Sequence, residues 1–131
     1  IGPFYKLDKK KQEQYKNNKD EVPGIFGQML PIKGAVDAYH KLSDKYDVYI
    51  LSSAPWKNPS AWSDKLEWVK KYLGPKARKR LILSHHKNLN KGDYLIDDRP
   101  NNGAKSFEGE WLSFGPRGSF ADWKSILNYL T

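Results

Sequence analysis

The chain has 131 residues, of which 38% are hydrophobic and 14% aromatic. That length and composition predict one folded domain with a packed core and exclude a disordered chain. The absence of cysteine excludes disulfides, thiolate zinc sites and a cysteine nucleophile. No apolar run approaches the roughly 18 residues of a membrane span, and the N-terminus has no signal-peptide pattern. We therefore expect a cytoplasmic protein that does not enter membranes.

The net charge of +8 and the pI near 9.5 favour anionic partners. Two classes of partner fit this charge, namely small phosphorylated molecules and nucleic acid. The lysines are spread along the whole chain, so most of them are expected only to solvate the surface. The sequence contains no nucleic-acid-binding motif, and a basic nucleic-acid-binding α/β module is therefore the third choice of function.

The first half of the chain predicts helix, strand and helix after a polar start. Residues 5–22 are rich in lysine and predict a surface helix or an ordered loop, and the Pro23-Gly24 pair marks a turn. Apolar residues then recur at helical spacing at Ala35, Val36, Tyr39, Leu42 and Tyr46. Residues 47–53 predict a buried strand that ends in two serines. Ser60 is the expected N-cap of the next helix, which Gly74-Pro75 ends.

The second half predicts three further strands and a final helix. The strands are expected at residues 80–84, 93–98 and 111–114, and the helix carries apolar residues from Phe120 to Leu130. Strands that alternate with helices indicate an α/β fold with a mainly parallel sheet. In such sheets ligands bind outside the carboxyl ends of the strands. The polar ends at Ser52-Ser53 and Asp97-Asp98 should therefore share one edge.

The Asp97-Asp98 pair is the strongest chemical signal. Two adjacent carboxylates are costly to hold together unless a cation compensates them, and carboxylate oxygens suit Mg²⁺. Alternatively, the two side chains only cap backbone amides in a turn. Ser52 and Ser53 could hold a phosphate with their hydroxyl and amide groups, and Lys65 in the following helix could add a positive charge. The alternatives are a polar strand exit and an exposed helix lysine.

Four segments together resemble the 5′(3′)-deoxyribonucleotidase family, a branch of the haloacid dehalogenase superfamily. These segments are Leu51-Ser52-Ser53-Ala54-Pro55, Asp64-Lys65-Leu66-Glu67-Trp68-Val69, Leu83-Ser84-His85-His86-Lys87 and Leu95-Ile96-Asp97-Asp98-Arg99-Pro100. The resemblance runs from about Pro23 to Asp98 and is weaker beyond. It implies a three-layer α/β/α Rossmannoid domain over residues 1–131, with a small helical cap at 1–30 and the core at 31–131.

The resemblance also implies the chemistry, which is Mg²⁺-dependent hydrolysis of a phosphomonoester such as a deoxynucleoside monophosphate. Ser52 would bind the transferred phosphoryl group and Ser53 would add a contact. Lys65 would neutralise phosphate charge and pair with a carboxylate, and Lys87 could approach the phosphate. Asp97 would bind Mg²⁺, and Asp98 would orient the metal shell. The three histidines are expected to be surface or packing residues: His40, His85 and His86.

One element of that family is not found in these 131 residues. Its first motif is an Asp-x-Asp at the end of an apolar strand in the middle of the sheet, and no Asp-x-Asp occurs here. A sheet without that strand leaves backbone groups unpaired, which could be met by an upstream segment, a strand from another chain including self-association, or a rearranged sheet. We expect an N-terminally shortened chain that is inactive by itself. The second choice is a phosphate- or nucleotide-binding protein without turnover.

Overall fold

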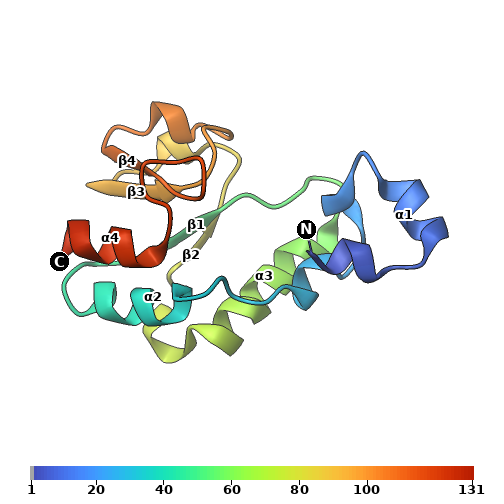
Figure 1. Ribbon diagram of the computed structural model, residues 1–131, viewed down its shortest axis with the longest axis horizontal. Coiled ribbons are helices and arrows are strands. Elements are labelled where there is room, and N and C mark those ends of the chain that lie inside the picture. The colour runs from blue at the N-terminus through green and yellow to red at the C-terminus, as the bar shows by residue number, and fades with distance from the viewer. Residues whose placement is uncertain (1) are drawn as a thin grey trace.

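The computed structural model describes residues 2–131. The helices are α1 (Lys9–Tyr15), α2 (Ala35–Ser43), α3 (Pro59–Tyr72) and α4 (Trp123–Leu130), and the strands are β1 (Ile50–Ser52), β2 (Leu81–Leu83), β3 (Tyr94–Asp97) and β4 (Glu110–Ser113). Figure 1 shows the N-terminal segment with α1 at one end of the molecule and β3, β4 and α4 toward the other. The expected order of helices and strands is therefore confirmed. None of the helices in the described range is long and apolar enough to span a membrane.

All strands run parallel to their partners, as predicted, but they form two pairs rather than one sheet. In the first pair Leu51 of β1 lies opposite Ile82 of β2, and in the second Ile96 of β3 lies opposite Leu112 of β4. The strands are three or four residues long, which is shorter than the sequence pattern predicted. Stacking in three layers stays a prediction.

Helix α2 connects the two halves of the core. One apolar cluster joins Tyr39 of α2 to Val69 and Leu73 of α3, with Ile50 of β1 packed against it. A second cluster joins Leu42 of the same helix to β4 and α4, with these buried members: Leu112, Ile126 and Leu130. The two strand pairs are therefore held in place through a shared helix.

Two expected helix starts were wrong. Helix α3 begins at Pro59 after Asn58, so Ser60 lies inside its first turn and is not the N-cap. The reason is that Pro59 is favoured at the first helical position, where an amide has no helical partner. Helix α4 begins at Trp123 after the N-cap Asp122, which forms a capping box with Ser125. Phe120 lies before this helix, in a bridge with Phe114.

The N-terminal segment has its own small core and is tied to the start of α3. Phe4, Val22 and Ile25 form this core. Asn58 is 2% exposed, and its amide nitrogen donates to the carbonyls of Asp20 at 2.9 Å and Val22 at 3.0 Å. The Ser60 hydroxyl in turn accepts the amide of Gly24 at 2.9 Å. A separate cap at residues 1–30 stays a prediction, but this segment lies directly over the N-terminal end of α3.

We expect Asn58→Ala to lower the free energy of unfolding by about 1–3 kcal/mol, because it leaves two carbonyls without their donor in a buried position. Urea denaturation measures this loss. Ser63→Ala removes an exposed hydroxyl bond on the same helix and is the control, with an expected change within about 0.5 kcal/mol. Equal effects of the two changes would contradict the anchoring role of Asn58.

Candidate functional site

The polar residues predicted from the strand ends do meet at one place. Ser52 is the last residue of β1 and Asp97 the last of β3. Both line a pocket of about 650 Å³ together with Lys87 and Asp98. The parallel direction of the strands explains the meeting, because the carboxyl ends of such strands lie at the same edge.

Lys65 contacts the end of β1 from helix α3. Its ammonium donates to the Ser52 hydroxyl at 2.8 Å and to the Ser53 carbonyl. The same ammonium lies 4.6 Å from the centre of the Phe26 ring, which belongs to the N-terminal segment. Lys65 is therefore held between β1 and the N-terminal segment.

The pKa of Lys65 is lowered from 10.5 to about 8. The main cause is burial, which disfavours the charged ammonium, and the positive charge of Lys87 adds to the effect. The negative charge of Asp20 opposes the shift in part. A nearby anion would reverse this pKa shift, so the site is electrostatically suited to a negatively charged ligand.

The buried ion pair of the site is formed by Lys87. Its ammonium lies 2.6 Å from a carboxylate oxygen of Asp97, and the two side chains are only 11% and 10% exposed. The other oxygen of Asp97 accepts the amide of Arg99 at 3.2 Å. The resemblance implied that Lys65 would pair with a carboxylate, whereas in the structure Asp97 pairs with Lys87. Lys87 is thus a central residue rather than a peripheral one.

Ser53 and Asp98 lie at the margin of this arrangement. The Ser53 hydroxyl accepts a hydrogen bond from the Asn102 side chain at 3.2 Å. The Asp98 side chain is 63% exposed and lies 3.9 Å from Arg99. Within residues 2–131 no group of three or more histidine, cysteine, aspartate or glutamate side chains is gathered as a metal site. Asp97 and Asp98 are therefore the acidic groups that this pocket offers to a cation.

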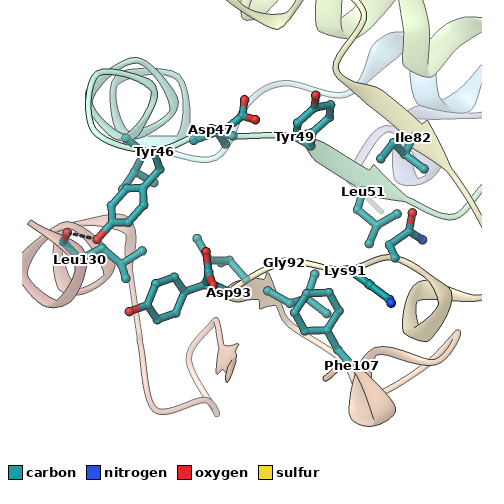
Figure 2. Close-up of a pocket in the computed structure, with 16 residues that line it drawn as sticks. Tyr46, Asp47, Tyr49, Leu51, Ile82, Lys91, Gly92, Asp93, Phe107 and Leu130 are labelled. Atoms are coloured by element: carbon teal, nitrogen blue, oxygen red, sulfur yellow. Dashed lines mark hydrogen bonds between the residues drawn. The ribbon is translucent and has the colours of Figure 1, made fainter. Parts of the chain in front are cut away.

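A groove separates the two strand pairs and leads to the same pocket. It has a volume of about 510 Å³ and is lined by β1 and by residues 90–96 of the segment that includes β3. Figure 2 shows Tyr49 and Leu51 on one side of this space and Gly92 and Asp93 on the other. Leu51 and Ile96 line both the groove and the pocket. The groove therefore runs between the strands toward Ser52 and Asp97.

Within residues 2–131, β1 and β3 each pair with another strand on one side only. The Ile50 amide and the Ser52 carbonyl bond to the segment containing β2, and in a parallel ladder alternate residues face the same neighbour. The backbone of Leu51 thus faces the groove. Likewise the carbonyls of Asp93 and Asp97 accept amides from the β4 side, which turns Ile96 toward the groove. The space has the hydrogen-bonding edges of a strand on both sides.

Asn102 is a residue that sequence reasoning missed. It has a positive φ of 54°, and its carbonyl accepts the amide of Lys87 at 2.6 Å. Together with its bond to Ser53, this links the loops that follow β1, β2 and β3. The Asn101-Asn102-Gly103 run signals a turn, but a turn signal does not reveal contacts with distant loops.

His85 is expected from the sequence to be a surface or packing residue. In the structure its ring lies near the rings of Trp56 and Trp62 and forms a hydrogen bond with the Ala54 carbonyl, in line with a packing role.

Comparison with known proteins decides the family. Residues 8–116 match the family described as 5′ nucleotidase, deoxy (pyrimidine), cytosolic type C protein. A Vibrio phage KVP40 protein assigned as a 5′(3′)-deoxyribonucleotidase is 56% identical over 120 residues, which cover 92% of this chain and 70% of the phage protein. The chain belongs to this 5′ nucleotidase family. This family is haloacid dehalogenase-like, as the sequence motifs predicted.

Cellular relatives of this 5′ nucleotidase family member match a shorter stretch. The human cytosolic-type 5′(3′)-deoxyribonucleotidase is 40% identical over 81 residues, which are 60% of this chain and 40% of the human protein. A Bordetella bronchiseptica protein assigned to the same activity is 40% identical over 80 residues, or 43% of its length. The chain thus spans less than half the length of these two relatives and 70% of the phage protein.

The shifted pKa of Lys65 predicts a pH-dependent cost to folding. The unfolded chain keeps this lysine protonated up to about pH 10.5, whereas the folded chain begins to lose the proton near pH 8. The cost is fully present below pH 8 and disappears between pH 8 and 10.5. We therefore expect the stability of the parent relative to Lys65→Met to rise between pH 7 and pH 10.

Urea denaturation of both proteins at the two pH values measures this difference. Lys70→Met changes an exposed lysine of the same helix and is the control, whose difference from the parent should be the same at both pH values. If the difference in free energy of unfolding between the parent and Lys65→Met does not vary with pH, this would contradict burial of a charged Lys65.

Proposed function

We propose that the pocket binds the phosphoryl group of a phosphomonoester, with a deoxynucleoside monophosphate as the substrate class, and that the complete site hydrolyses it. The observation that carries this proposal is the meeting of two ammonium groups, Lys65 and Lys87, with Ser52 and Asp97 at one edge. The relatives named as 5′(3′)-deoxyribonucleotidases support the substrate class. A small phosphorylated partner and a cytoplasmic location accord with this proposal.

Each residue has a role that follows from its contacts. The Ser52 hydroxyl exchanges its bond with Lys65 for a bond to a phosphoryl oxygen, and Ser53 adds a further polar group. Lys65 and Lys87 supply positive charge, which stabilises the charge on the phosphoryl oxygens during transfer. Phosphate binding also relieves the repulsion between the two lysines, because the anion lies between like charges.

The acidic pair suits Mg²⁺ only together with a ligand. Mg²⁺ commonly takes one or two carboxylates and completes its shell with water and substrate phosphate, and Asp97 and Asp98 offer that number of carboxylates. Asp97 would hold the ion, and its bond to Lys87 fixes the carboxylate in place. Asp98 is exposed and would orient the surrounding shell. When bound, Mg²⁺ would neutralise phosphate charge.

Hydrolysis also needs a nucleophile, and no Asp-x-Asp occurs in the 131 residues. The groove between β1 and β3 is the place proposed for an apolar strand that ends in this motif. Its two edges carry free backbone groups, and it opens at Ser52 and Asp97. A strand parallel to both neighbours would bring its terminal carboxylates next to Lys65 and Lys87. An upstream segment or a different chain would supply such a strand, whereas self-association of these 131 residues would fill the groove without the motif.

Binding without turnover is the second candidate function. It is supported by the groups that would bind phosphate, which lie together within residues 2–131. In this case the lysines and Ser52 hold a phosphate or nucleotide, and no covalent step follows. The two candidates predict the same ligand and differ only in phosphate release.

The activity test uses Mg²⁺-dependent phosphate release from a panel of deoxynucleoside monophosphates. We expect no release by the chain alone, and release after addition of an apolar peptide that ends in Asp-x-Asp. Asp97→Asn should abolish this release, because it removes the charge that holds the metal. Asp37→Asn, which changes an exposed aspartate on α2, is the control and should leave release unchanged.

Two results would change the conclusion. Release by the chain alone that depends on Asp97 would show that a nucleophile is present elsewhere or is lent by a second copy. No release with the peptide, from folded protein that still binds phosphate, would favour binding without turnover.

The groove itself is tested by hydrogen exchange. We expect the same peptide to slow exchange of the amides of Leu51 and Ile96, because both face the space where the strand would pair. A peptide of the same composition in scrambled order is the control. Unchanged exchange at both positions, with peptide bound elsewhere, would place the strand outside the groove.

A further inference from the structure

The loop that follows β4 is a closed turn of fixed shape. The amide of Gly115 bonds the Phe120 carbonyl at 2.8 Å, and the amide of Phe120 bonds the Ser113 carbonyl at 3.0 Å. Gly115 has a φ of +118°, which side-chain-bearing residues rarely adopt. A Cβ on Gly118 would lie 2.3 Å from the Ser113 carbonyl oxygen, so only glycine fits there. The loop thus holds its tip, including Arg117, in a defined position.

Arg117 is carried by this loop to the wall of the candidate pocket. It lines the same 650 Å³ space as Ser52, Lys87 and Asp97. Arg80 and Arg99 are engaged with Asp47 and Asp98. Within residues 2–131, Arg117 itself has neither an ion pair nor a hydrogen-bond acceptor within the usual distances. Arg117 is exposed, so its five donors are accessible to a ligand.

A second donor on the same wall also lacks a partner. Trp123 lines the pocket at the start of α4, where its ring packs against Phe114 with 4.8 Å between centroids. The indole N–H of Trp123 is buried and has no hydrogen-bond partner. A buried donor without an acceptor costs free energy. Among the described residues, the β4 side of the pocket therefore carries an arginine without an ion pair and, beneath the surface, an indole N–H without an acceptor.

We propose that Arg117 is a phosphate-binding residue that holds the substrate's phosphoryl group from the β4 side, opposite Lys65. This inference rests on the proposed function. A guanidinium forms two parallel bonds to phosphate oxygens, and the fixed loop reduces the conformational entropy lost on binding. Arg117 also balances the charge of the pocket, because Asp97 and Asp98 would otherwise repel a phosphate. Arg117 lies outside the four segments that carry the resemblance to the 5′(3′)-deoxyribonucleotidase family.

The test measures binding of inorganic phosphate in the presence of Mg²⁺ by calorimetry. We expect Arg117→Gln to raise the Kd about tenfold or more, because it removes charge-assisted bonds to the anion. Arg117→Lys keeps the charge but not the paired geometry and should give an intermediate Kd. Arg78→Gln, an arginine that lines a different pocket beside α3 and β2, is the control and should bind as the parent does.

The outcomes separate this inference from the proposed function. If the parent binds phosphate and Arg117→Gln binds equally well, Arg117 has no role and the proposed site stands. If the parent does not bind phosphate, both the site and the role of Arg117 are overturned. Urea denaturation of each variant shows whether it is folded, and a variant with unchanged stability and weaker binding supports direct contact with the anion.

Discussion

The arrangement of this protein depends on two lysines that are held close together at the carboxyl ends of parallel strands. Lys87 is stabilised by the buried carboxylate of Asp97, whereas Lys65 has a hydroxyl and a carbonyl as partners. Burial, together with the positive charge of Lys87, lowers the pKa of Lys65 to about 8. The fold therefore accepts an electrostatic cost in the free protein, and an anion in the pocket would offset it. This is the physical basis of the proposed phosphate site.

The surrounding elements each maintain that arrangement. Helix α3 carries Lys65 to β1, and Asn58 and Ser60 at its start tie down the N-terminal segment, which places Phe26 over the ammonium. Asn102 links the loops after β1 and β2 by its bonds to Ser53 and Lys87. Helix α2 packs into both halves of the core. The pocket is consequently shared between the two strand pairs and depends on their separation.

That separation is also what makes the groove important. A continuous sheet would satisfy the backbone of β1 and β3, but here each of them pairs on one side only, and both line the same groove. Free edges invite pairing with another strand, and the apolar side chains of Leu51 and Ile96 would pack against it. Completion of the sheet and completion of the catalytic site would then be the same event, which couples folding energy to activity.

The sequence by itself determined the order of helices and strands, their parallel direction, and the polar residues at the strand ends. These features follow from local periodicity and from the rule that strand ends share an edge. Only the tertiary structure decided that Asp97 pairs with Lys87, that the strands form two pairs, and that Arg117 and Trp123 line the pocket. Such contacts join residues far apart in the chain, so side-chain reach and loop closure determine them and no local pattern records them.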